Sequence, residues 1–211
     1  MAKTTSPYSA SITGGGYLQD EFDRLLPLML SNRSNELLKD EIANNNLLQI
    51  NSLNTRNRAV AEFKKRFSTC DEKFWDHYQN TIGTEHQLLY FFVLLRTYRI
   101  LLDLHLRVTV RRFMAADETW SSEAIRQEFD EIAVNDEFVD SWTDMTKKKI
   151  SSTYQTILRK IGFLEESSDT LHAISQNAND YRYFLENGEI WFLEACFLRQ
   201  YEINNMRSAL S

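Results

Sequence analysis

The stretch from Glu85 to Met114 constrains the fold of this chain more than any other. It reads EHQLLYFFVLLRTYRILLDLHLRVTVRRFM and holds neither glycine nor proline. Its apolar residues recur at spacings of three, four and seven and wrap around most of a helical wheel, so a helix here would have no wholly polar face. We predict one long central helix that is buried on most sides, with the rest of the chain packed on it.

The same stretch is not expected to cross a membrane. A bilayer-spanning helix needs about 20 consecutive, predominantly apolar residues. Polar or charged side chains interrupt this stretch at Arg96, Arg99, Asp103, His105 and Arg107. The first eleven residues, MAKTTSPYSAS, also lack the apolar run of a signal peptide. We therefore predict a cytoplasmic protein with no membrane partner.

The scarcity of proline favours long helices through the body of the chain. Both prolines, Pro7 and Pro27, lie near the N-terminus, so after them only glycines and capping residues are expected to stop a helix. With 43% hydrophobic and 26% charged residues, the composition is that of a globular protein. Cys70 and Cys196 lie far apart without a CxxC pattern, which is typical of free thiols in a reducing compartment.

These features predict a mainly α fold, a helical bundle around the long central helix. We divide the chain into an N-terminal helical region with a helix-turn-helix-like unit (1–84), the central buried helix (85–116), a winged-helix unit carrying a small β-hairpin (117–175) and a C-terminal helical hairpin (176–211). Residues 1–13 are expected to form a leader that ends in a turn at Gly14–Gly16. A phosphate-binding loop is not expected there, because no Lys and Ser/Thr follow the glycines.

A first basic cluster lies on the helix predicted from Thr55 to Phe67. Val60, Phe63 and Phe67 share one face of the helical wheel, and we place Arg58, Lys65 and Arg66 on the other face. Two helices and a turn precede this basic helix, which is the order of a helix-turn-helix. The alternative is an ordinary solvated face of a bundle, and the sequence leaves both interpretations open.

The segment from Trp120 to Ile174 has the order of a winged helix. Ser121 or Ser122 caps a helix to Ala133, a short helix spans 136–142, and Thr143 or Asp144 caps a third helix that Gly162 ends. Residues 163–165 and 170–174 then read as two strands joined by a turn. In a winged helix, the third helix is the one that enters the DNA major groove.

The exposed face of this third helix carries the second candidate DNA contact. The buried stripe Ile150, Tyr154, Ile157, Leu158 and Ile161 leaves Lys148, Ser152, Gln155 and Arg159 on the opposite side, with Lys147, Lys149 and Lys160 flanking them. Such side chains bind base edges and phosphates. Residues 146–161 hold five basic residues and no acid, although the protein has a net charge of −6. A protein-docking winged helix or a solvated face would carry the same pattern.

No catalytic pattern stands out. The four histidines lack an HExxH or other short metal-binding spacing, and a GxSxG elbow is absent. His105 lies within an apolar helix and is expected to be a hydrogen-bonded core residue. The acids at Asp130, Glu131, Asp136, Glu137 and Asp140 fit a solvated helical face better than a metal-dependent nuclease site. We predict a protein that is not an enzyme and has no cofactor and no metal.

Three groups of residues resemble the BrxA family, small accessory proteins of bacteriophage exclusion (BREX) defence systems. They are Tyr8-Ser9-Ala10-Ser11-Ile12-Thr13-Gly14-Gly15; Asn46-Leu47-Leu48-Gln49 followed by Ser52, Thr55 and Arg58; and Trp142, Thr146, Leu158, Gly162 and Phe163-Leu164. The resemblance implies a cytoplasmic, largely helical protein that binds double-stranded DNA and is encoded beside a methyltransferase, a phosphatase-like protein and ATPases. It identifies no contact residues.

The leading hypothesis is a non-enzymatic module that binds double-stranded DNA through the winged helix, with the helix at 55–67 as a second contact. A second hypothesis is a protein-protein adaptor that docks other BREX proteins through the winged helix and the aromatic C-terminal hairpin. A third is an all-helical RNA-binding protein, which would prefer RNA to duplex DNA. The oligomeric state does not follow from the sequence.

Overall fold

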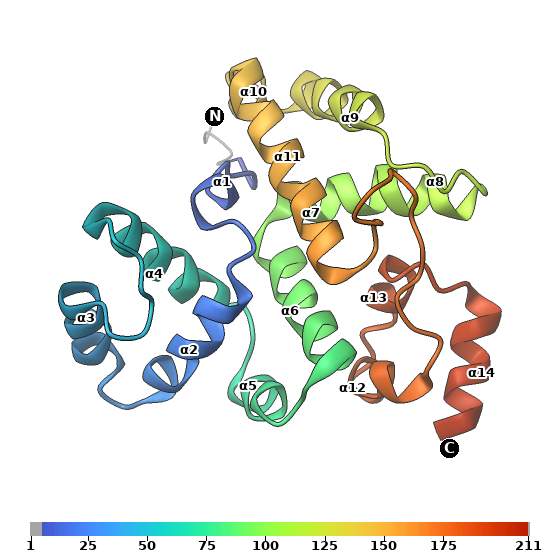
Figure 1. Ribbon diagram of the computed structural model, residues 1–211. Helices are drawn as coiled ribbons and strands as arrows, with labels where there is room; N and C mark the ends of the chain where they lie inside the picture. The colour runs from blue at the N-terminus through green and yellow to red at the C-terminus, as the bar shows by residue number, and fades with distance from the viewer. Residues whose placement is uncertain (1–5, 211) are drawn as a thin grey trace, which may run out of the picture.

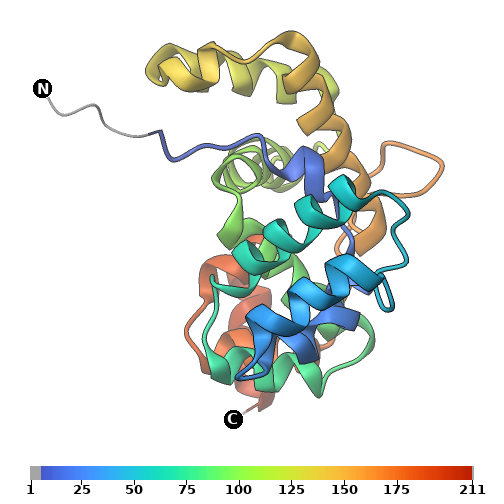
Figure 2. The same cartoon turned by 90° about the vertical axis from the view of Figure 1, so that its left-hand side faces the viewer.

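The computed structural model describes residues 6–210, and the fold is mainly helical. Helix α6 runs through the middle, α2 to α5 lie on one side of it, α12 to α14 lie on the other, and α9 to α11 lie toward the top of the view (Figure 1). Turned by 90°, the same cartoon shows α10 projecting beyond the rest of the fold (Figure 2). The predicted mainly α class is confirmed, and residues 1–5 and 211 lie outside the described part.

The predicted single central helix is wrong, because the stretch bends sharply at Tyr98. Helix α6 (Gly83–Thr97) ends there, and α7 (Arg99–Leu104), a π-helical segment (His105–Val110) and α8 (Arg111–Met114) continue in a different direction (Figure 1). Tyr98 has extended backbone angles, φ −117° and ψ 96°. The Thr97 hydroxyl donates to the Val93 carbonyl at 2.7 Å, a contact that often bends helices.

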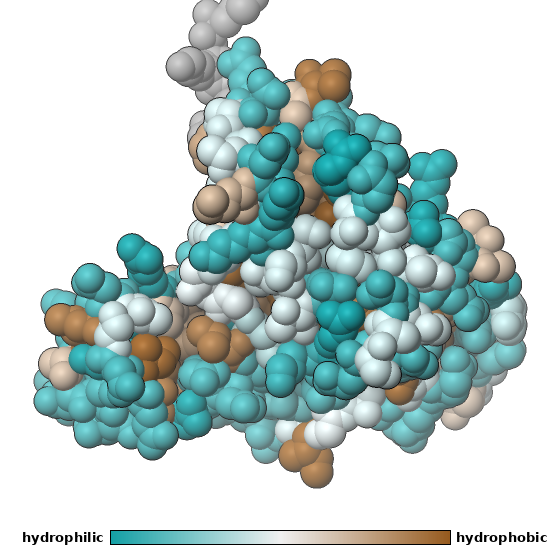
Figure 3. All heavy atoms as spheres, turned by 45° about the horizontal axis from the view of Figure 1, so that its top comes forward, coloured by the Kyte–Doolittle hydropathy of each residue, from teal (hydrophilic) through white to brown (hydrophobic). Residues whose placement is uncertain are grey.

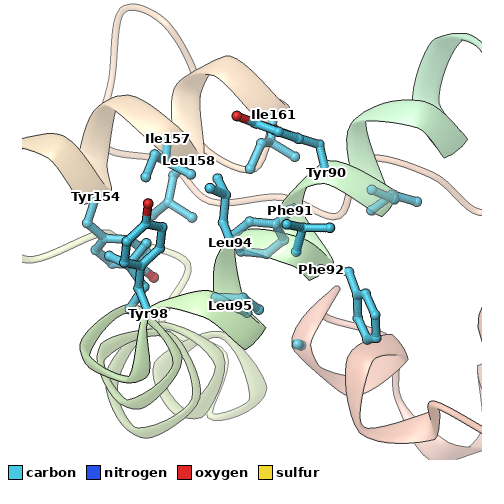
Figure 4. Close-up of a cluster of buried hydrophobic side chains, with 14 of the residues drawn as sticks. Tyr90, Phe91, Phe92, Leu94, Leu95, Tyr98, Tyr154, Ile157, Leu158 and Ile161 are labelled. Carbon is cyan, nitrogen blue, oxygen red and sulfur yellow. The ribbon is translucent and has the colours of Figure 1, made fainter. Parts of the chain in front are cut away.

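Helix α6 is nevertheless the buried centre that its apolar run predicts. Each side chain from Leu88 to Leu95 is at most 1% exposed. The buried stripe of α11 (Asp144–Ile161) points toward α6, with Ile157, Leu158 and Ile161 facing Phe91 and Leu94 (Figure 4). Within the described residues, none of the helices combines the length and apolarity that a membrane span requires.

The N-terminal region contains five helices: α1 (Ile12–Gly15), α2 (Gln19–Leu30), α3 (Ser34–Asn44), α4 (Leu53–Phe67) and α5 (Glu72–Gln79). Helix α1 is a single helical turn at the end of the predicted leader. Pro27 lies inside α2, and the helix continues past it to Leu30. Helix α4 begins two residues earlier than predicted, because the Ser52 hydroxyl accepts the Thr55 backbone N–H. The Asp71 carboxylate caps α5 by accepting the Phe74 N–H at 2.9 Å.

The three helices predicted for the region after Trp120 are present, but the predicted β-hairpin is not. The helices are α9 (Ser122–Asn135), α10 (Glu137–Asp140) and α11, and Ser121, Asp136 and Thr143 cap them. In place of strands, the described residues have two isolated antiparallel β-bridges, which pair Thr119 with Thr170 and Leu164 with Leu171. The segment after Gly162 is too short and too irregular in its pairing to form a sheet.

The C-terminal hairpin is more broken than predicted. It consists of a 3-10 turn (Ala178–Tyr181), α12 (Arg182–Glu186), α13 (Ile190–Ala195) and α14 (Gln200–Leu210). The second half of the predicted hairpin is interrupted after Ala195, and Phe197 adopts a positive φ of 68° between α13 and α14. The aromatic residues of the hairpin form core contacts, for example Phe192 with Phe92 at 5.2 Å between ring centroids.

Candidate nucleic-acid interface

Helix α11 is defined locally at both ends. The Thr143 hydroxyl accepts the Thr146 backbone N–H at 3.2 Å, and Gly162 ends the helix in the left-handed region at φ 91°. An L-residue with a Cβ adopts that conformation at a cost, so glycine is favoured there. The buried stripe holds one side of α11 against the core, and the opposite side faces solvent.

Three of the predicted site residues on α11 are open to solvent. Lys148, Lys149 and Ser152 are exposed, and among the described residues neither lysine has an ion-pair partner. Lys160 is exposed on the same flank as Lys149. These side chains are able to meet a phosphate without first breaking an internal contact.

The other three predicted α11 residues are engaged within the protein. Lys147 is only 15% exposed at its side chain and lies 3.7 Å from the Asp130 carboxylate of α9. Arg159 forms an ion pair with Asp169 at 3.4 Å and donates to the Glu165 carbonyl at 3.3 Å, so it holds the loop that follows α11. The Gln155 amide lies beside both Arg159 and Asp169.

A groove of about 730 Å³ separates α9 from α11, and its walls carry both signs of charge. Arg126 of α9 binds Glu123 at 2.6 Å and Asp130 at 2.9 Å. The residues that line the groove are Trp120, Ser122, Glu123, Arg126, Phe129, Asp130, Asp144, Lys147, Lys148, Ser151, Ser152, Gln155 and Asp169. Because its cations are largely paired with its acids, the groove itself attracts a polyanion less than the open face of α11.

On α4, Arg58 and Lys65 lie two helical turns apart on the exposed side. Arg58 is exposed and has no ion-pair partner among the described residues. Lys65 is partly covered: its Nζ donates to the Ser11 hydroxyl at 3.1 Å and lies 4.8 Å from the centroid of the Tyr98 ring. Both side chains remain candidates for phosphate contacts.

The prediction that Arg66 lies on the exposed face of α4 is wrong, because its side chain is fully buried and not available to DNA. Its guanidinium donates to the Tyr98 hydroxyl at 2.9 Å, to the Tyr17 carbonyl at 2.9 Å and to the Gly16 carbonyl at 2.7 Å, and also to the Tyr90 hydroxyl. Burial alone would lower the pKa of Arg66, but the Tyr90 and Tyr98 hydroxyls outweigh it and the pKa is raised. Arg66 is therefore a charged structural residue.

The reason for this burial lies in the helical register of α4. Arg66 follows Phe63, a fully buried residue, by three positions, which places both on one face. Arg56 lies on the same side and is also buried, with its guanidinium bound to the carbonyls of Ile42, Ile50 and Asn51. The sequence analysis placed Arg66 on the opposite, exposed face of this helix.

The segment from Tyr8 to Gly16 joins α4 to the central helices, a role that the sequence analysis missed. The Tyr8 hydroxyl donates to the buried Asp103 carboxylate at 2.8 Å, and the Ser11 hydroxyl donates to Glu62 at 3.1 Å. A Cβ on Gly15 would lie 2.8 Å from Arg66 Nη2. This segment places α1 between α4 and α11, with α9 on the far side of α11 (Figure 1).

His105 supports α11 from beneath. One ring nitrogen lies 2.8 Å from the Tyr154 hydroxyl of α11, and the other lies 2.7 Å from the Ala195 carbonyl. Complete burial lowers the pKa of His105 to about 4, so the ring is neutral at pH 7. The prediction of a hydrogen-bonded core histidine is confirmed.

The described residues do not assemble a recognisable catalytic centre. No group of three or more His, Cys, Asp or Glu side chains within residues 6–210 is placed to hold a metal ion. Burial raises the pKa of the Cys70 thiol to about 11 and that of Cys196 well above its ordinary value, so both thiols stay protonated at pH 7. Neither is activated as a nucleophile.

Comparison with known proteins finds a matching family model and a solved structure with a similar fold. The model of the family described as BrxA matches residues 6–186. The crystal structure of an uncharacterized protein from Magnetospirillum magneticum superposes with a TM-score of 0.76 at 20% sequence identity, covering 90% of this chain and 98% of that one. At this identity the similarity shows a shared fold alone. No curated protein matches the sequence.

Proposed function

Because the chain belongs to the BrxA family, we propose that it is a non-enzymatic accessory protein of a BREX defence system that binds double-stranded DNA through helix α11. The observation that carries the proposal is the charge of this helix. Residues 146–161 hold five basic side chains and no acid in a protein of net charge −6. Lys148 and Lys149 face solvent without an ion-pair partner among the described residues.

The connections around α11 support a winged-helix interpretation. Residues 118–120, which precede α9, meet the loop after α11: the Trp120 N–H donates to the Asp169 carbonyl and the Leu171 N–H donates to the Glu118 carbonyl, each at 2.7 Å. These two hydrogen bonds tie the loop after α11 to the segment that enters α9. Arg159 and Asp169 hold that loop against α11 here.

Helix α4 supplies the second contact of the proposed interface. It packs on α1, which also packs on α11, so the two basic helices flank one short element. Seen with the top of Figure 1 brought forward, the surface over this end is mostly hydrophilic (Figure 3). We therefore propose that Arg58 and Lys65 contact phosphates of the same duplex that α11 binds. Such contacts position the protein but do not read the base sequence.

The test is a fluorescence anisotropy titration of labelled duplex DNA with the full chain. We expect the wild type to bind, and Lys148→Glu/Lys149→Glu to lose at least tenfold in affinity, since two phosphate contacts become repulsive. The matched control is Lys39→Glu/Lys73→Glu, which makes the same charge change at exposed lysines of α3 and α5. Circular dichroism checks that all three proteins are folded.

Two outcomes would contradict the proposal. If the control pair loses as much affinity as the α11 pair, binding reflects total charge and α11 is not the contact. If the wild type binds an RNA duplex or single strand more tightly than duplex DNA, the RNA-binding hypothesis replaces this one.

A protein-docking role is favoured by a separate observation. Residues 127–140 contain six acids and no lysine or arginine, and within them Val134 is 83% and Phe138 50% exposed. An acidic surface with exposed apolar side chains repels DNA and suits a basic protein surface. The adaptor hypothesis predicts that Val134→Ser/Phe138→Ser abolishes binding to a purified BREX protein while duplex binding is unchanged.

A further inference from the structure

Met145 differs from every other apolar side chain of α11. The buried stripe of the helix is at most 2% exposed, whereas Met145 is 79% exposed. It lies in the first turn, one residue after Asp144 begins the helix. Packing within this chain therefore does not account for a large apolar side chain at this position.

The neighbours of Met145 on the helix surface are the candidate DNA contacts. Lys148, Lys149 and Ser152 follow it by three, four and seven residues, so all four share one exposed face. Asp144, Lys148 and Ser152 also line the groove toward α9, whereas Met145 does not. Met145 thus lies at the end of a basic, unpaired surface, and charge complementarity selects DNA as the molecule that covers it.

A recognition helix in the major groove brings its first turn closest to the base edges. The apolar group that the major groove presents is the 5-methyl of thymine, and apolar side chains bind it. Methionine is unbranched and flexible, which lets it follow a methyl group without fixed geometry. We propose that Met145 contacts thymine 5-methyl groups and gives the protein a preference for A·T base pairs. This inference rests on the proposed function, since it requires α11 to lie in the major groove.

The expected effect is modest and measurable. Removing one buried methyl-sized group costs about 0.8 kcal/mol, which corresponds to about a fourfold loss of affinity. Deoxyuridine lacks only the 5-methyl of thymidine and keeps its base pairing. The affinity of an A·T-rich duplex divided by that of the same duplex with every thymidine replaced by deoxyuridine therefore measures the methyl contact.

The experiment determines this ratio by fluorescence anisotropy for the wild type, Met145→Gln and Val134→Gln. Glutamine keeps the length and helix propensity of methionine but removes its apolar end. Val134 is equally exposed but lies on α9 outside the α11 face, so its variant is the matched control. We expect a ratio of about four for the wild type and the control, and about one for Met145→Gln.

Three other results would each overturn the inference that Met145 contacts thymine methyl groups. If the wild type binds both duplexes equally, no methyl is contacted, although the proposed DNA-binding function stands. If Met145→Gln keeps the wild-type ratio, another residue is responsible for the preference. If the wild type binds neither duplex, the proposed function fails and this inference fails with it.

Discussion

Helices α4 and α11 carry the same number of basic residues but present different surfaces. Each is amphipathic and carries five basic residues. In α4, Arg56 and Arg66 are buried and bind backbone carbonyls and tyrosine hydroxyls. In α11, none of the five basic side chains is buried. Counting basic residues therefore overestimates the basic surface of α4. Arg66 follows the core residue Phe63 by three positions, so it lies on the buried face and adds nothing to that surface.

A buried polar side chain also fixes the buried side of each helix, and these two supports differ in charge. Arg66, which belongs to α4 itself, remains a cation. His105 under α11 is neutral at pH 7, because burial lowers its pKa to about 4. The two supports should therefore respond differently to substitution and to acid.

The largest effect is expected from Arg66→Ala. The substitution removes the Arg66 donor from two buried tyrosine hydroxyls and from the Gly16 carbonyl, while the Tyr17 carbonyl keeps the Tyr90 hydroxyl as a donor. Breaking such a buried charged network costs about 3–5 kcal/mol. Urea unfolding measures the loss. Arg58→Ala, an exposed arginine on the same helix, is the control and should change the free energy of unfolding by less than about 0.5 kcal/mol. Equal losses for the two variants would refute the assignment of Arg66.

The next effect is a loss of stability in acid through His105. Its pKa is about 4 in the folded protein and near 6.5 when unfolded. Below pH 6.5 the unfolded chain takes up a proton that the folded chain does not, so stability is complete above pH 6.5 and falls toward pH 4. The total from this group is about 3 kcal/mol.

Urea unfolding between pH 7 and pH 4 checks this dependence. His105→Gln should be less stable at pH 7 but should lose less stability on acidification than the wild type. His172→Gln, at an exposed histidine, serves as the control. An unchanged pH dependence in His105→Gln would contradict the account.

A smaller effect is expected at the contact between the N-terminal segment and α4. A Cβ on Gly15 would lie 2.8 Å from Arg66 Nη2 and 3.1 Å from Glu62 Cβ. Gly15→Ala should therefore destabilise the protein by about 1–3 kcal/mol through overpacking. Gly14→Ala is the matched control, since no atom lies within 4 Å of its added Cβ. Thermal unfolding of both variants compares them, and a Tm for Gly15→Ala no lower than that for Gly14→Ala would show that the clash is relieved.

The smallest effect concerns α4 as the second DNA contact. Arg58→Glu/Lys65→Glu should weaken duplex binding by about three- to tenfold, less than the change at Lys148 and Lys149, because Lys65 is already partly engaged with Ser11. Anisotropy with the same duplex measures both variants. A larger loss on α4 than on α11 would reverse the assignment of primary and secondary contact.

The ends of the helices were the most predictable part of the fold. Ser121, Thr143 and Gly162 act through local hydrogen bonds or a local backbone conformation, so their sequence signals predicted the observed termini. The buried stripe of α11 was predicted for the same reason, since a 3.6-residue period is local information.

The features that depend on distant residues were not predictable. Tyr98 bends the central stretch without glycine or proline, and its hydroxyl reaches Arg66 and Glu62 of α4. The ion pairs that engage Lys147 and Arg159 come from α9 and the loop after α11. Periodicity assigns a residue to a face, but it does not show which partner covers that face.

The most direct test of the difference between α4 and α11 is the salt dependence of duplex affinity. We expect log affinity to fall linearly with log salt concentration, with a slope about two units shallower in Lys148→Glu/Lys149→Glu than in the wild type, because two phosphate contacts are lost. The Lys39→Glu/Lys73→Glu control should keep the wild-type slope. If the α11 pair keeps the wild-type slope as well, Lys148 and Lys149 do not contact phosphates, and α11 is not the DNA-binding helix.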